Sequence, residues 1–133
     1  MSKTLLVFTL CGALILTACG SGGVGADSTP GTVPAKYAGQ VNPLDSSAAE
    51  QGSRLFSANC LSCHGPEGHG DGPVASGLNP KPRNLAVLQQ TAADDYLIWR
   101  ISTGKPGTAM VGWGTVLTTE QIWQVIAFIR TLQ

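Results

Sequence analysis

Apolar residues recur at helical spacing in three stretches of this chain of 133 residues. In the first, from Ser47 to about Asn59, Leu55 and Phe56 follow Gly52 at intervals of three and four residues, which places them on one face of a helix. A glycine on that face would let a second helix approach closely. The stretch therefore predicts a helix that packs against another helix.

The other two stretches lie in the second half of the chain. Between residues 92 and 103 the spacing involves Leu97, Ile98 and Ile101, and from Thr119 to about Leu132 one stripe holds Ile122, Val125, Ile126 and Ile129. No stretch alternates between apolar and polar residues in the manner of a half-buried strand. The pattern predicts an all-α domain.

Capping signals indicate where these helices begin and end. SAAE at residues 47–50 and TTEQ at residues 118–121 each have the form of a capping box, whose side chains bind the free amides of the first turn. Thr91 or Asp94 is expected to open the middle helix, and Gly104 to close it because glycine tolerates a left-handed cap.

Two segments without apolar periodicity predict irregular structure. The glycine-rich segment 65–77 and the following Pro80 and Pro82 predict a loop. Residues 19–45 are rich in Gly, Ser, Thr and Pro and predict a flexible tether with a reach of roughly 25 to 30 Å. A loop packed on the domain is the alternative for this segment. The folded domain is expected to span residues 46–133.

The first residues resemble a bacterial lipoprotein signal. The apolar stretch from Leu5 to Leu16 is shorter than the roughly 20 residues that a transmembrane helix needs. It ends in LTAC at residues 16–19, which is similar to a lipobox, whose cysteine receives lipid after cleavage. We expect a signal peptide at 1–18 and lipidation of Cys19. The alternatives are an ordinary secretory signal and a membrane-anchor helix.

Composition narrows the functional classes. Hydrophobic residues make up 43% of the chain and charged residues 12%, which fits a globular domain and not a disordered charged chain. Eight Lys and Arg balance eight Asp and Glu without a basic run, which argues against a nucleic-acid partner. So small a domain is expected to need something besides side chains in its core.

The motif CLSCH at residues 60–64 carries the most specific chemistry. Cys60 and Cys63 can each form a thioether to a haem vinyl group, and His64 can then bind the iron. A thioredoxin-like redox pair would need a βαβ setting that the pattern does not predict. A zinc site with His69 as fourth ligand is the other alternative, although adjacent Cys63 and His64 make tetrahedral closure awkward.

These residues resemble the class I cytochromes c, from about Glu50 to the end of the chain. The likeness rests on GxxLFxxxCxxCHG from Gly52, on GTAMxGW at 107–113 and on IWxVIAFI at 122–129. It implies the class I cytochrome c fold, three to five helices wrapped around one covalent haem c. It also implies that the first and last helices cross, with Gly52 and Phe56 against Phe128.

The sixth iron ligand is expected to be Met110. Once Met1 is removed, Met110 and His69 are the plausible donors beyond His64, and His69 lies too close in sequence to reach the opposite haem face. A His/Met pair stabilises ferrous iron and raises the reduction potential, which suits an electron carrier.

The resemblance also implies a set of haem-pocket residues. In the family a proline carbonyl orients the iron-binding histidine, and Pro82 is the candidate, with Pro80 and Pro73 as alternatives. Arg83 is expected to pair with a haem propionate, or else to lie solvated at the surface. The expected apolar walls and edge cover are Leu85, Ile101 and Trp113.

The function implied is one-electron transfer without a small-molecule substrate, on the periplasmic face of a bacterial membrane. Expected partners are a quinol-oxidising complex, a terminal oxidase or a photosynthetic reaction centre, and Lys81, Arg83 and Lys105 would favour an acidic docking patch. A fixed haem subunit of a larger oxidoreductase complex fits the same motifs. A haem-based sensor or enzyme would need an open sixth position, which Met110 argues against.

Overall fold

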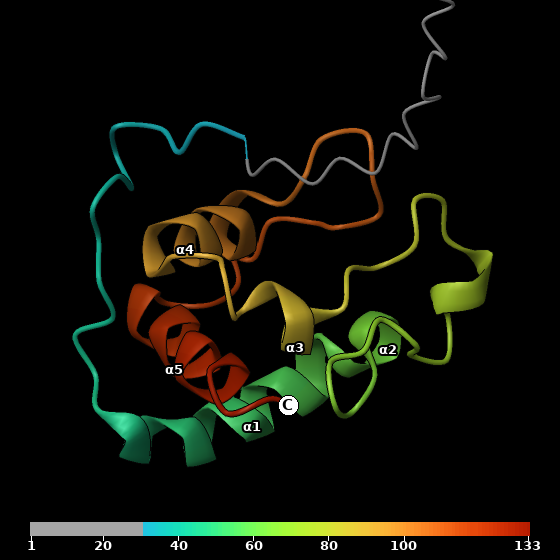
Figure 1. Cartoon of the computed structure of the whole chain (residues 1–133), viewed down its shortest axis with the longest axis horizontal. Helices are drawn as coiled ribbons and strands as arrows, with labels where there is room; N and C mark the ends of the chain where they lie inside the picture. Colours follow the sequence, from blue (N-terminus) through green and yellow to red (C-terminus); the bar gives the residue numbers. More distant parts are fainter. Residues whose placement is uncertain (1–30) are drawn as a thin grey trace, which may run out of the picture.

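The computed structural model describes residues 31–133, and these residues are helical without strands (Figure 1). The α-helices are α1 (Ala49–Asn59), α2 (Leu61–His64), α3 (Leu85–Leu88), α4 (Asp94–Thr103) and α5 (Thr119–Ile129). Two short 3-10 turns, η1 (Ser46–Ala48) and η2 (Ala75–Gly77), accompany them. The all-α prediction is confirmed, and the three long helices are those predicted. The one-turn helices α2 and α3 were not predicted.

Helices α1 and α5 cross at a glycine (Figure 1). A Cβ atom placed on Gly52 would lie 1.9 Å from the backbone oxygen of Gln124 and 3.0 Å from Cβ of Phe128. One turn further along α1, the rings of Phe56 and Phe128 meet with centroids 5.1 Å apart. The expected crossing is confirmed, and it holds the two helices at backbone contact distance.

The predicted apolar stripes form the core. On α4 the side chains of Leu97, Ile98 and Ile101 are buried. On α5 the buried residues include all four members of the predicted stripe, Ile122, Val125, Ile126 and Ile129. Burying each such side chain stabilises the folded state by about 1.5–3 kcal/mol relative to leaving it in water. Burial of these two faces, together with Phe56, holds α1, α4 and α5 around a common centre.

The capping predictions had mixed outcomes. At α5 the Thr118 hydroxyl accepts from the amide of Gln121, whose side chain accepts from the amide of Thr118, so this capping box is confirmed. The box predicted at residues 47–50 is wrong, because Asp45 caps η1 instead and α1 begins after Ala48 without a side-chain cap. Ser47 lies inside η1, where its amide and its hydroxyl both donate to Asp45 Oδ1.

The middle helix begins and ends close to the predicted residues. Asp94 is the first residue of α4, but neither it nor Thr91 caps the helix, since the N-cap Ala93 offers no side-chain acceptor. Gly104 ends α4 with a φ of 73°, in the left-handed region that favours glycine, so this end is as predicted.

Residues 33–44, which we call the strap, lie against the helices (Figure 1). The backbone amide of Asn42 donates to Asp94 Oδ2 over 2.9 Å, and the side-chain Nδ2 of Asn42 donates to the backbone carbonyl of Trp123 over 2.9 Å. Tyr37 and Leu44 pack against the core. The tether predicted up to residue 45 is therefore wrong for this part, because these polar contacts and apolar side chains give the strap a fixed path.

The predicted signal peptide and Cys19 lie outside the described residues. Within residues 31–133, no helix has the length and apolar character needed to cross a membrane.

Candidate functional site

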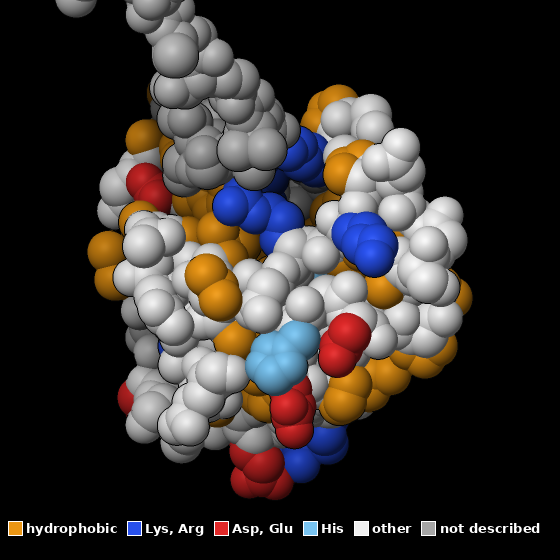
Figure 2. All heavy atoms as spheres, turned by 45° about the vertical axis from the view of Figure 1, so that its right-hand side comes forward, with side chains coloured by type: hydrophobic (Ala, Val, Ile, Leu, Met, Phe, Trp, Pro, Cys, Tyr) orange, Lys and Arg blue, Asp and Glu red, His pale blue; other side chains and the backbone are white. Residues whose placement is uncertain are grey.

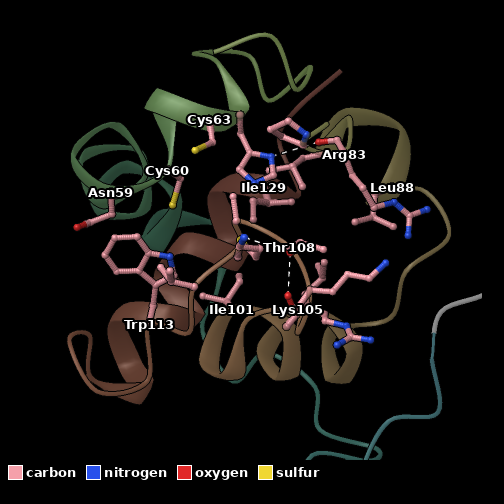
Figure 3. Close-up of a pocket in the computed structure, with 18 of the residues that line it drawn as sticks. Asn59, Cys60, Cys63, Arg83, Leu88, Ile101, Lys105, Thr108, Trp113 and Ile129 are labelled. Atoms are coloured by element: carbon pink, nitrogen blue, oxygen red, sulfur yellow. Dashed lines mark hydrogen bonds between the residues drawn. The ribbon is translucent and has the colours of Figure 1, made fainter. Parts of the chain in front are cut away.

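The end of α1 and the turn of α2 bring the CLSCH motif to one side of a cavity of about 410 Å³. The amide of Cys60 donates to the carbonyl of Phe56 over 2.7 Å, and the amide of His64 donates to the carbonyl of Cys60 over 2.9 Å. Cys60, Cys63 and His64 all line the cavity. Figure 3 shows the sulfur atoms of both cysteines on the same side of it. Local helix geometry thus gathers the three groups at one wall.

The other walls come from α3, α4, α5 and the loop before α5. Leu85 at the start of α3, Ile101 on α4, and Val125 and Ile129 on α5 supply apolar surface. Trp113, from the loop before α5, closes one edge beside Cys60 (Figure 3). The volume lies within the range of about 300–1,000 Å³ that is usual for ligand and cofactor pockets. An apolar slot with sulfur and imidazole donors at its walls fits a flat metal-binding macrocycle.

Burial shifts the pKa of Cys60 and of His64. It raises the pKa of the Cys60 thiol to about 12, with a smaller contribution from the neighbouring Cys63. Burial also lowers the pKa of His64, against the opposing effect of a backbone hydrogen bond. At neutral pH both groups are therefore uncharged, and a neutral imidazole keeps a lone pair for a metal.

The orientation of His64 comes from a residue other than the one predicted. Its Nδ1 lies 3.2 Å from the carbonyl oxygen of Arg83, so Nε2 is the nitrogen available to a metal. The prediction that the Pro82 carbonyl holds this ring is wrong, and neither alternative proline supplies the contact. The Pro82 oxygen instead faces Gly70, where a Cβ atom would lie 2.4 Å from it. Arg83 thus contributes its backbone to the site.

The loop that carries Met110 is held by its own backbone and one hydroxyl. The amide of Lys105 donates to the carbonyl of Met110 over 3.0 Å, which closes the loop at its base. The Thr108 hydroxyl donates to the carbonyl of Lys105 over 2.8 Å and accepts from the amide of Met110 over 3.1 Å (Figure 3). Gly104 allows this closure, since a Cβ there would lie 2.4 Å from the Met110 oxygen. Met110 lines the same cavity as His64.

The structure brings together all the candidate pocket residues. Besides Cys60, Cys63, His64 and Met110, the cavity is lined by the five residues that the family resemblance implied for the pocket, Pro82, Arg83, Leu85, Ile101 and Trp113. His69 does not line it, and its Nε2 lies 3.2 Å from the carbonyl of Gln133. The zinc alternative therefore lacks its fourth ligand in the described structure, where no three His, Cys, Asp or Glu side chains gather as a metal site.

Positive side chains surround the cavity, and one of them was not predicted. Its charged lining residues are Lys81, Arg83, Lys105 and Arg100, with no Asp or Glu among the described residues that line it. Figure 2 shows Lys and Arg side chains gathered around a hollow on one face. Arg100 was missed because a cation between two apolar positions of a helix usually faces solvent, and no local motif marks it.

Comparison with known proteins relates the chain to c-type haem proteins. Residues 47–129 match the family described as cytochrome c oxidase, cbb3-type, subunit III. A curated relative, the cbb3-type cytochrome c oxidase subunit FixP of Azorhizobium caulinodans, is 31% identical over 91 residues. The match covers 68% of this chain and 29% of the relative, so the chain spans less than a third of that protein.

Two solved structures share the fold. Cytochrome cL of the marine methylotroph Methylophaga aminisulfidivorans superposes with a TM-score of 0.51 at 25% identity, over 65% of this chain and 54% of that one. A chain of the reducing HAO-like protein complex of Kuenenia stuttgartiensis gives a TM-score of 0.59 at 24% identity, over 68% and 47%. The second likeness supports the fold alone.

Proposed function

Because the chain belongs to the family of cbb3-type cytochrome c oxidase subunit III, an electron-transfer family with covalent haem c, we propose that it is a one-electron carrier with His/Met-ligated haem. The observation that carries this proposal is the convergence of Cys60, Cys63, His64 and Met110 on one apolar cavity. Cys60, Cys63 and His64 come from one motif and Met110 comes from a separate loop, so His64 and Met110 could hold a flat group from two sides.

Each of these residues has a distinct role in the proposal. The haem iron supplies reversible one-electron oxidation and reduction. Cys60 and Cys63 hold the group through thioether bonds. His64 offers Nε2 while the Arg83 carbonyl fixes the ring through Nδ1, and such outer contacts set the tautomer and orientation of a ligating histidine. Met110 offers its thioether sulfur from a loop braced by Thr108.

A filled sixth position separates a carrier from an enzyme or sensor. With His64 and Met110 both holding the iron, oxygen, carbon monoxide or peroxide would find no free site on it, and the bound group would supply electron transfer alone. The thioether favours the reduced ion. Apolar walls from Leu85, Ile101 and Ile129 would shield the bound group from water, which would also favour its less charged, reduced state.

Covalent attachment can be tested directly. We expect haem to stay with the polypeptide through acidified-acetone extraction and denaturing electrophoresis, and to be lost from the Cys60→Ala, Cys63→Ala double variant. Ser62→Ala, at an exposed position between the two cysteines, is the matched control and should keep its haem. Complete extraction of haem from the unaltered protein would refute the thioether assignment.

The carrier could move freely or belong to a fixed complex. The likeness to FixP, a subunit of an oxidase, supports membrane redox partners, and a terminal oxidase is then the preferred partner over a quinol-oxidising complex or a photosynthetic reaction centre. Purification of the native membrane complex through a tag on this chain tests the choice. Stable co-purification with oxidase subunits supports the fixed subunit, whereas recovery of the chain alone supports a shuttle.

We further propose that the domain lies outside the cytoplasm and is anchored through lipid on Cys19. The support is the LTAC segment at residues 16–19, together with the family's typical location. Mass spectrometry of the membrane-derived protein should find a first peptide that begins at Cys19 with added acyl mass. An unmodified N-terminus at another residue would contradict the anchor.

A further inference from the structure

Gly31, the first described residue, lies beside the positively charged side of the cavity. A Cβ atom placed on Gly31 would be 3.1 Å from Nη2 of Arg100 and 3.6 Å from Cη2 of Trp99. The charged residues that line the cavity, which we call the cationic rim, are Lys81, Arg83, Arg100 and Lys105. The part of the chain that precedes the domain therefore meets it next to the cationic rim.

The strap determines where the chain meets the domain. From η1 it runs past α5 and α4 (Figure 1). Besides the contacts of Asn42 described above, the backbone amide of Gly39 donates to Asp95 Oδ2 over 3.0 Å, and Val33 packs against the core. Without these contacts the chain would leave the folded domain at Asp45, the N-cap of η1, and not at the cationic rim.

The distance in sequence between Gly31 and the proposed lipid anchor limits the orientations that the domain can take. Cys19 is about 12 residues before Gly31, and that many residues span at most about 43 Å when fully extended. A domain of about 100 residues has a radius of gyration of about 13 Å, which corresponds to a sphere about 33 Å wide with a half circumference of about 50 Å. The connection is therefore too short to pass around the domain, so the cationic rim cannot point directly away from the membrane.

A domain released from its strap would not be limited in this way. It would be connected at Asp45, about 26 residues after Cys19, and that connection could extend to about 90 Å, which is enough for any orientation. We propose that the strap is an orienting element: it keeps the cationic rim turned toward the membrane, so that the domain exchanges single electrons with a membrane-embedded redox partner. This inference rests on the proposed function and its lipid anchor.

The test uses the full-length, haem-loaded, lipidated protein in phosphatidylcholine vesicles. An insertion of ten Gly and Ser residues between Pro30 and Gly31 adds about 35 Å of reach and leaves the strap unchanged. The double variant Tyr37→Ala, Asn42→Ala weakens the strap, because it removes a ring packed on the core and the side-chain hydrogen bond to α5. Val41→Ala is the matched control, since this strap residue is 74% exposed.

Two readouts report the orientation. The first is energy transfer from a fluorophore on the lipid headgroups to the haem, which decreases as the haem moves away from the membrane. The second is the ratio of two rates, at which the ferrous protein gives one electron to ferrocenium carried on a lipid headgroup and to ferrocenium dissolved in water, forming ferrocene in each case.

We expect the insertion and the double variant to lower both the energy transfer and the rate ratio, and Val41→Ala to change neither. If the double variant does not accumulate, the insertion decides. Energy transfer and a rate ratio equal to those of wild type in the insertion variant would overturn the inference while leaving the electron carrier intact. A wild-type protein that lacks covalent haem, or that does not stay on the vesicles, would instead overturn the proposed function or its anchor.

Discussion

Replacing Gly52 with alanine tests the crossing that aligns the site. The added methyl group would stand 1.9 Å from the Gln124 oxygen and 2.6 Å from its carbonyl carbon, whereas ordinary contact begins near 3.4 Å. These are backbone atoms of α5, so no side chain can rotate away. The helices must separate, and α5 carries Val125 and Ile129 in the cavity wall.

The expected change in the free energy of unfolding of Gly52→Ala follows from two opposing effects. Overpacking costs about 1–3 kcal/mol, and a backbone obstacle puts this site near the upper limit. Alanine recovers about 1 kcal/mol through its better helix propensity. The net loss is thus about 2 kcal/mol, which lowers the melting temperature of a domain of this size by about 8–16 °C.

Thermal unfolding of the haem-loaded variant, followed by circular dichroism, measures this loss. Gly77→Ala is the control, because a Cβ there meets nothing within 4 Å and its φ is not in the left-handed region. It should leave the melting temperature unchanged or slightly raised. A Gly52→Ala protein as stable as wild type would refute the close crossing.

Two further predictions concern the helix ends. Thr118→Ala removes the capping box of α5 and should cost about 1 kcal/mol in chemical denaturation, while Thr119→Ala, one position inside the same helix, should cost much less. At η1, hydrogen bonds from Ser47 hold the pKa of Asp45 below 3.8. The stabilisation of the folded state by Asp45 should therefore be complete above that pH and should vanish as the pH falls through the lowered pKa. Asp45→Asn, which still caps but does not titrate, should remove this pH dependence of the urea midpoint; an unchanged dependence would contradict the cap.

The sequence was sufficient where a feature is repetitive or chemically specific. Three helices follow from spaced apolar residues, and the crossing of α1 and α5 followed from Gly52 and Phe128 through a family resemblance. The strap could not be predicted, because its contacts to Asp94 and Trp123 join residues far apart in sequence. Composition alone favours a flexible tether for such a segment.

The features of the site that the sequence did not predict depend on how the backbone is arranged in space. Any residue can offer a carbonyl, so nothing in the sequence distinguishes Arg83 from Pro82 as the partner of His64. The one-turn helix α3 holds only four residues, too few to show a helical period. Arg100 lines the cavity because of how α4 packs in the fold, which no local sequence pattern indicates.

The central claim, a haem iron with both axial positions filled by His64 and Met110, is tested most directly at Met110. Ferrous wild-type protein should bind carbon monoxide poorly, and its ferric form should show the weak near-infrared sulfur-to-iron band. Met110→Ala should keep covalent haem, lose that band, bind carbon monoxide and have a lower potential. Ready uptake of carbon monoxide by wild type, or an unchanged spectrum and potential in Met110→Ala, would contradict the ligand assignment and favour a ligand-binding sensor or enzyme.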